Sequence, residues 1–376
     1  MVFMAEYKHK TQPKELLPVA IELLLGIRQP KQPQQKEMVN DGKIFPDKED
    51  FGNPAVYELL SKTANKYPES TCIHYQGRNM TYAEVDEASS RLASALAGLG
   101  VNKGDRVAIM LPNTPQFVIS YFGILKAGGV VVPCSMLYTP SELEHQLRDS
   151  GATIVIGLKD VITKKVKENG REVKKSDDYF SSIEGCTDNL SLKHIITTSV
   201  TDYLPSAKRS LAPLVSALTG VKTVSRPGTI DFVKLIGSSD PMASFPTVNS
   251  KEDIAVLQYT GGTTGVSKGA MLTHYNLYSN AAYTAKTFPM TKDDISLCVL
   301  PLFHIYGATA TMNSALYAGS KLVLLPEFHV QDVMKAIQKQ GVTLFCGVPA
   351  IYNAIINSPK VGRFDLRSVR VCMSGS

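Results

Sequence analysis

Apolar and polar positions alternate along most of this chain as a parallel α/β protein requires. Short apolar runs of strand length recur between longer segments with helical spacing, and the alternation returns after residue 250. The predicted strands are 106–111, 130–132, 153–156, 194–197, 254–259, 295–300, 321–325, 344–348 and 369–373. The predicted helices are 81–99, 115–126, a segment from 139, 274–287, 305–317, 330–340 and 349–357. Helical crossovers between buried strands indicate parallel sheets, so the expected fold class is α/β with two doubly wound subdomains.

Two of these helices carry a sequence signal for where they begin. Thr81 and Glu84 form a Thr-x-x-Glu capping box, and Thr139 and Glu142 form another, with Pro140 at the first helical position. In such a box the threonine side chain accepts a hydrogen bond from the third helical N–H, while the glutamate accepts one from the threonine N–H. We therefore expect helices to begin directly after Thr81 and Thr139.

The stretch between about residue 159 and residue 250 has no such clear pattern. The lysine-rich segment 164–175 fits either a solvated surface helix or a hairpin. The segment 201–220, which contains leucines, prolines and a Lys-Arg pair, fits either a plain connecting helix or a lid that contacts a membrane surface. Polar and proline-rich residues at 29–36 indicate that the first 54 residues are an extension and linker.

Composition places the chain among globular proteins. Of its 376 residues, 44% are apolar and 20% are charged, which excludes disorder along the whole length. The net charge of +6 suits anionic ligands or an anionic membrane surface, whereas the lack of finger spacings and long basic stripes argues against nucleic acid. No two of the six cysteines have CxxC spacing, so we expect free, buried thiols in a reducing cytoplasm. The apolar segment 16–27 is too short to span a bilayer.

One loop carries the strongest indication of chemistry. It follows the predicted strand 254–259 and precedes a helix predicted near residue 274. Its glycines allow a tight backbone path close to a ligand, and its threonine hydroxyls and lysine can bind phosphate oxygens. It is not a Walker A motif, because Lys268 follows Ser267 rather than a glycine. The residues expected to bind phosphate are Thr260, Gly261, Gly262, Thr263, Thr264, Gly265 and Lys268.

The run from residue 257 to residue 274 closely resembles the phosphate loop of adenylate-forming acyl-CoA synthetases. Within that superfamily it is most similar to the long-chain fatty-acid–CoA ligases. Gly261 and Ser267 depart from the pattern, since many members carry serine and proline at these positions. Further segments that resemble the family are 80–84, 104–108, 127–133, 300–307 and 347–352. The resemblance covers about residues 50 to 376 and leaves the N-terminal extension unexplained.

The resemblance implies a two-step reaction that uses ATP, Mg²⁺, CoA and a fatty acid. A carboxylate attacks the α-phosphorus of ATP to give acyl-adenylate and pyrophosphate, and the CoA thiol then displaces AMP from the acyl carbon. The implied catalytic residues are Lys268, beside the leaving pyrophosphate, and His304, beside the α-phosphate, with Thr260 as a magnesium partner. The implied acyl pocket is lined by His304, Tyr306, Gly307 and Gly347. The implied adenine-side residues are Ser374, Gly375 and Ser376.

The resemblance also sets the expected organisation. We expect an extension at 1–54, a first α/β subdomain with a basic insertion at 55–250, and a second subdomain with the phosphate loop at 251–376. Together the two would form the large N-terminal domain of an adenylate-forming enzyme. The family pattern continues with an aromatic–Gly–Thr–Glu segment and a mobile C-terminal domain that the printed sequence does not contain. We therefore expect acid–thiol ligase activity from the full-length form and none from this chain alone.

Two other functions stay open at this point. One is a ligase for an aryl or short-chain acid, because no residue of the chain sets the acyl length. The other is a non-catalytic nucleotide-binding remnant. The expected location is the cytoplasm, and both a peripheral membrane contact and a homodimer stay open.

Overall fold

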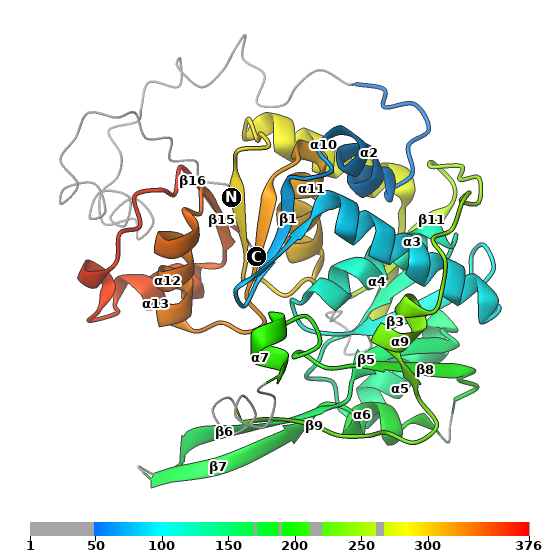
Figure 1. Ribbon diagram of the computed structural model, residues 1–376, viewed down its shortest axis with the longest axis horizontal. Helices are drawn as coiled ribbons and strands as arrows, with labels where there is room; N and C mark the ends of the chain where they lie inside the picture. The colour runs from blue at the N-terminus through cyan, green and yellow to red at the C-terminus, as the bar shows by residue number, and fades with distance from the viewer. Residues whose placement is uncertain (1–48, 169–170, 188–189, 211–219, 261–266, 376) are drawn as a thin grey trace.

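The computed structural model describes residues 49–168, 171–187, 190–210, 220–260 and 267–375. Two large sheets with helices between and around them form the body, and a narrow two-stranded arm extends from it (Figure 1). Several predictions lie outside the described residues. They concern residues 1–48 of the extension, Gly261, Gly262, Thr263, Thr264, Gly265 and Ser376.

The first large sheet has six strands. In spatial order these are β16 (Val371–Ser374), β15 (Leu344–Gly347), β13 (Ile295–Cys298), β14 (Lys321–Leu324), β1 (Thr71–Tyr75) and β2 (Arg78–Thr81). All neighbours are parallel except β1 and β2, which form an antiparallel hairpin at one edge. The four later strands match predictions, whereas the hairpin was not predicted.

The second large sheet has seven strands. In spatial order these are β10 (Ile230–Asp231), β8 (His194–Thr198), β5 (Ile154–Leu158), β3 (Arg106–Met110), β4 (Val130–Pro133), β11 (Ile254–Thr260) and β12 (Lys268–Thr273). Only the β11–β12 pair is antiparallel. β12 lies where the sequence predicted a direct passage from loop to helix, so the predicted phosphate loop joins two strands of a hairpin.

Helices cover both large sheets. Their bounds are α2 (Glu58–Lys66), α3 (Tyr82–Gly98), α4 (Pro115–Lys126), α5 (Pro140–Ser150), α6 (Ser181–Glu184), α7 (Ser206–Ser210), α9 (Phe232–Gly237), α10 (His274–Thr287), α11 (Ser314–Ala318), α12 (Val330–Gln340), α13 (Pro349–Ile356) and the 3₁₀ turn η4 (Val361–Arg363). Both predicted capping boxes are present, at Thr81 with Glu84 and at Thr139 with Glu142. The predicted helix 305–317 divides into a π-helix, η3 (Gly307–Asn313), followed by α11.

One hydrophobic core joins the two large sheets. It contains side chains of α3, α4 and strands from both sheets, and every residue of α4 is buried. Figure 1 shows α3 and α4 in this central position. The α4 sequence is apolar almost throughout, as expected of a helix covered on all sides. Cys72, Cys134, Cys186, Cys298 and Cys346 are buried, Cys372 is half-buried, and none is in a disulfide.

The lysine-rich segment forms a hairpin rather than a helix. β6 (Asp160–Glu168) and β7 (Arg171–Asp178) are antiparallel, and β9 (Val221–Thr223) pairs with the base of β6. Together they form the third, small sheet, which extends as the arm at the bottom of Figure 1. Among the helices that the structure describes, none has the length and apolar character that a bilayer span needs.

Each large sheet takes strands from both sides of residue 250. β1 and β2 lie in the six-stranded sheet with β13 to β16, while β11 and β12 lie in the seven-stranded sheet with β3 to β5. The sheets are therefore not divided at the boundary that the sequence pattern suggested. Because β11 and β12 join the sheet formed by earlier strands, their hairpin lies beside the segment that follows β13 in the other sheet.

Candidate functional site

The two ends of the predicted phosphate loop meet at the end of β11. Thr260, the last residue of β11, is the register partner of Lys268, the first residue of β12, and both are exposed. The hydroxyl of Ser267 donates a hydrogen bond of 3.0 Å to the Thr260 carbonyl. Ligands of open α/β sheets bind outside the carboxyl ends of the parallel strands, and β11 is parallel to β4. The structure thus places Thr260 and Lys268 together where a ligand is expected.

His304 lies in the segment that follows β13 of the other sheet. Its backbone N–H donates to the carbonyl of Pro301 (3.1 Å), and its carbonyl accepts from Ala308 (3.0 Å). The imidazole Nδ1 accepts from the N–H of Tyr306 at 3.2 Å. Because Nδ1 accepts, the ring proton of the neutral imidazole is on Nε2. His304 is exposed, so this Nε2–H is available to donate to an anionic ligand.

Two buried amides hold the His304 segment in place. Asn113, at the end of β3, donates to the carbonyls of Cys298 (3.1 Å) and Leu300 (2.9 Å) and accepts from the N–H of Leu302 (2.8 Å). Gln258, two residues before Thr260, donates to the carbonyl of Phe303 at 3.1 Å. The strand that carries the loop is therefore bonded directly to the residue that precedes His304.

Gly307 is required by close packing at the start of η3. A Cβ on this residue would lie 2.4 Å from the carbonyl oxygen of Pro301. The helix that follows carries buried side-chain oxygens for which the described residues provide no hydrogen-bond partner, at Thr309, Thr311 and Asn313. The Oε1 atom of Gln258 is also buried without a hydrogen-bond partner among the described residues. Buried polar atoms of this kind usually find water or a ligand, and π-helical turns are frequent at functional sites. The segment therefore fits a site that a polar ligand completes.

The predicted adenine-side residues meet the predicted acyl-pocket residues at the β15–β16 edge. Gly347 is the register partner of Ser374, and the N–H of Gly375 donates to the Gly347 carbonyl at 3.3 Å. The hydroxyl of Tyr306 donates to the carbonyl of Met373 at 3.0 Å, and its ring lies 3.4 Å from where a Gly375 Cβ would be. Tyr306 therefore contacts the predicted adenine side, although the sequence placed it in the acyl pocket. Burial raises the pKa of Tyr306, so its hydroxyl keeps its proton.

Sequence reasoning missed the residues that connect these motifs. Asn113 and Gln258 act through contacts across the two sheets, and α5 contacts the β11–β12 hairpin through His145 and Asp149. The only local signal was that polar residues stand at the ends of buried strands, as Asn113 does after β3 and Gln258 does in β11. Such positions meet at one edge of a parallel sheet.

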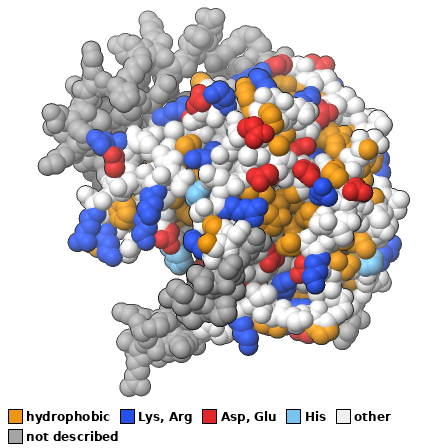
Figure 2. Space-filling view, viewed as in Figure 1, with side chains coloured by type: hydrophobic (Ala, Val, Ile, Leu, Met, Phe, Trp, Pro, Cys, Tyr) orange, Lys and Arg blue, Asp and Glu red, His pale blue; other side chains and the backbone are white. Residues whose placement is uncertain are grey.

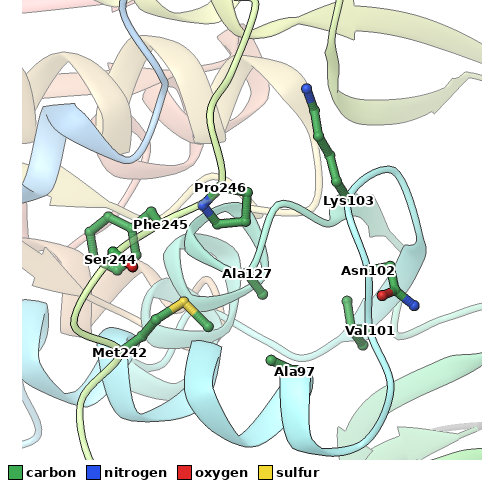
Figure 3. A pocket seen from close by; sticks show the side chains of 9 residues that line it. All are labelled: Ala97, Val101, Asn102, Lys103, Ala127, Met242, Ser244, Phe245 and Pro246. Atoms are coloured by element: carbon green, nitrogen blue, oxygen red, sulfur yellow. The ribbon is translucent and has the colours of Figure 1, made fainter.

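A cavity of about 380 Å³ lies away from these residues (Figure 3). It is formed by the end of α3, the turn after it, and the segment 242–246. Figure 3 shows the Lys103 side chain extending away from the other lining residues, and its ammonium pairs with Asp253 at 2.7 Å. None of the predicted site residues lines this cavity. Within the described ranges, no group of three or more His, Cys, Asp or Glu side chains is placed to hold a metal ion.

Comparison with known proteins identifies the class to which this fold and site belong. The family model described as AMP-binding enzyme matches residues 60–376, which is most of the chain. The chain belongs to the AMP-binding enzyme family.

Individual relatives show which members of the family this chain is similar to. The chain is 36% identical over 360 residues to a long-chain-fatty-acid–CoA ligase of Bacillus subtilis (strain 168), across 93% of this chain and 59% of that protein. It is 33% identical over 335 residues to a long-chain-fatty-acid–CoA ligase of Salmonella typhimurium (strain LT2), across 85% of this chain and 55% of that protein. The chain thus spans somewhat more than half the length of these relatives.

Solved structures support the fold. The structure of the anthranilate CoA ligase AuaEII in complex with anthranoyl-AMP superposes with a TM-score of 0.72 at 23% sequence identity, across 86% of this chain and 55% of that one. The α/β architecture with parallel sheets predicted from the sequence is confirmed.

Proposed function

We propose that this chain forms the ATP- and acid-binding part of a fatty-acid–CoA ligase. The observation that carries the proposal is the hydrogen bond from Gln258 to the Phe303 carbonyl. It joins the strand that ends in Thr260 to the segment that carries His304, which supports one site formed by residues from both sheets. The identity to two long-chain-fatty-acid–CoA ligases supports an aliphatic acid as the substrate.

The chemistry of the first step requires charge neutralisation. The acid carboxylate attacks the α-phosphorus of ATP, the bond to the β-phosphate oxygen breaks, and pyrophosphate leaves. Two anions must approach each other, so cationic and N–H or O–H donors at the phosphates lower the barrier. We assign Lys268 and residues 260–265 to the β- and γ-phosphates. We assign the Nε2–H of His304 to the α-phosphate and the incoming carboxylate.

The remaining predicted residues take binding roles. We assign Gly307, Gly347 and Tyr306 to the acyl pocket, where the two glycines allow close packing against the Pro301 carbonyl and the Tyr352 ring. Ser374 and Gly375 would border the adenine side, which the Tyr306 hydroxyl also reaches through the Met373 carbonyl. Mg²⁺, with Thr260 as one ligand, would neutralise phosphate charge when bound. In the second step the CoA thiol attacks the acyl carbon and AMP leaves with the electron pair of the broken C–O bond.

The test is acid-dependent ATP–pyrophosphate exchange by the natural full-length protein, with acetate, octanoate, palmitate and benzoate compared side by side. We expect exchange that is highest with octanoate or palmitate. Highest exchange with benzoate or acetate would instead assign an aryl or short-chain acid. ATP binding without exchange for any acid would favour the non-catalytic nucleotide-binding alternative.

We also propose that the enzyme works in the cytoplasm and makes a peripheral contact with membranes. The net charge of +6 favours an anionic membrane surface. On the face shown in Figure 2, basic and acidic side chains are scattered over the body. Cosedimentation with anionic and with neutral vesicles tests the contact. Equal binding to both, or none, would contradict it.

A further inference from the structure

The helix α5 contacts both ends of the predicted phosphate loop. The Nε2 atom of His145 lies 3.2 Å from the carbonyl oxygen of Ser267, directly before Lys268. The hydroxyl of Tyr259, directly before Thr260, donates a 2.5 Å hydrogen bond to the carboxylate of Asp149. His145 and Asp149 are four residues apart, so they lie on the same face of α5. One helix face therefore contacts the chain on each side of the loop.

Tyr259 is held firmly between α5 and the hairpin. The residue is 7% exposed and belongs to a hydrophobic cluster with Leu143 and Leu147 of α5. A Cβ on Gly269 of β12 would lie 3.0 Å from the Tyr259 ring, so the ring packs directly against the β12 backbone. Burial and the carboxylate of Asp149 raise the pKa of Tyr259, and its hydroxyl therefore stays protonated and donates to Asp149.

Ser267 is held from two directions. Its hydroxyl donates to the Thr260 carbonyl at 3.0 Å, and its own carbonyl lies against His145. A carbonyl oxygen can only accept, so His145 must donate through a protonated Nε2. The Thr260–Lys268 rung of the ladder lies beside these bonds. The separation of the two loop ends is thus set by side chains of α5 as well as by the strand pairing.

We infer that His145 and Asp149 are positioning residues that hold Ser267 and Tyr259, and so set how the adjacent Lys268 and Thr260 meet the phosphates of a nucleoside triphosphate. The inference rests on the proposed function and names two residues for its phosphate site. Residues that are already held in place lose less conformational entropy when they bind a ligand. The effect therefore belongs to nucleotide binding rather than to acid binding.

The experiment uses the natural full-length protein and measures the KM for ATP and for the acid in pyrophosphate exchange. We expect His145→Ala and Asp149→Ala each to raise the KM for ATP about tenfold, as expected for loss of a hydrogen bond to a positioned group. The KM for the acid should stay within about twofold, and the melting temperature within about 2 °C. This split would not follow from a general loss of stability.

Conservative substitutions at the same two positions should preserve the KM for ATP. His145→Gln keeps an N–H donor and Asp149→Asn keeps an acceptor for the Tyr259 hydroxyl, so both should stay within about threefold of the wild-type KM for ATP. A matched control is His329→Ala with Asp332→Ala, at the start of α12 on the other large sheet, where the two side chains pair with Glu327 and Lys335. The control should leave both KM values unchanged.

Two results would overturn the inference. One is an unchanged KM for ATP in both alanine variants, and the other is an equal rise in the KM of ATP and of the acid. Failure of the proposed function is a separate result, because it appears as absent exchange in the wild-type protein. In that case calorimetric Kd values for ATP replace the KM values, and the same tenfold rise is expected.

Discussion

The imidazole of His274 is held neutral inside the protein. The residue is 3% exposed, and its Nδ1 accepts a hydrogen bond of 3.1 Å from the N–H of Val56. Burial lowers the pKa of His274 to about 4, against the attraction of Asp253 for the protonated ring. Protonation in the folded state would therefore place a charge in the core and remove the acceptor for Val56.

This burial predicts a loss of stability in acid. Between pH 4 and pH 6.5 the unfolded chain binds a proton at His274 that the folded chain does not, so stability falls as the pH drops through this window. The loss should be on the order of 3 kcal/mol. Urea unfolding at several pH values measures it. In His274→Leu the overall stability should be lower, but this part of the pH dependence should vanish. An identical dependence of stability on pH in both proteins would show that His274 is not its source.

Lys268 is an exposed residue whose proposed role lies in the transition state. We expect Lys268→Ala to lower the rate of ATP–pyrophosphate exchange about a hundredfold in the full-length protein, because one cationic donor at the leaving phosphates is removed. The melting temperature should not change, since the side chain is exposed at the start of an edge strand. Lys335→Ala, on the exposed face of α12, is the control. An unchanged exchange rate in Lys268→Ala would remove the residue from the mechanism.

The sequence could predict the site residues that share one short segment. Thr260 and Lys268 stand out because glycine and threonine density next to a lysine is visible locally. Asn113, Gln258 and His145 act through partners 45 to 189 positions away in the sequence. Such contacts depend on which strands become neighbours, and no local pattern contains that information.

At the scale of elements, the sequence predicted those features that depend only on residues close together in the chain. Thr81 and Thr139 cap their helices as predicted, because a capping box involves only four consecutive residues. β12 was not predicted for two reasons. Its sequence contains glycine and alanine, and it is an edge strand with half of its residues exposed. Edge strands depend on pairing with a neighbour more than on β-propensity. The hairpin β6–β7 stayed ambiguous because its lysine-rich sequence fits either a surface helix or a hairpin.

The π-helix η3 gives an element-scale prediction. Gly307→Ala would place a methyl group 2.4 Å from the Pro301 carbonyl, so the turn that presents His304 must shift. We expect a loss of about 2 kcal/mol in stability from this overpacking, together with a large loss of exchange activity. Gly98→Ala is the control, because nothing lies within 4 Å of a Cβ at that helical position. Equal effects of the two substitutions in chemical unfolding and exchange would show that η3 tolerates the methyl group.

At the scale of the whole molecule, the two large sheets behave as one folded body. The shared core contains α3, α4 and strands of both sheets. Asn113, just after β3, adds three hydrogen bonds to the end of β13 and the segment that follows it. We infer that the sheets unfold together, because separating them exposes this core and leaves buried carbonyls without donors.

Asn113→Ala tests this coupling. Removing the amide leaves the buried Leu300 carbonyl and the Leu302 N–H without their partner, while the Cys298 carbonyl keeps the N–H of Leu325. The free energy of unfolding should fall by about 3 kcal/mol. Asn357→Ala, an exposed asparagine at the end of α13, should change it by less than about 0.5 kcal/mol. Denaturant unfolding followed by tyrosine fluorescence and by circular dichroism gives the values. A small change in Asn113→Ala, with coincident transitions, would mean that the apolar core alone joins the sheets.

The position of the β11–β12 hairpin bears on how this protein can diverge. β12 is the last strand of the seven-stranded sheet, and the loop before it connects two antiparallel neighbours. An insertion or deletion in such a loop leaves the register of the strands behind it unchanged. Strand register therefore does not oppose a change of length between Thr260 and Lys268, and the proposed phosphate binding is what constrains it. In variants that no longer depend on phosphate binding, length should change there more readily than at the β3–α4 junction, where Asn113 joins the two sheets.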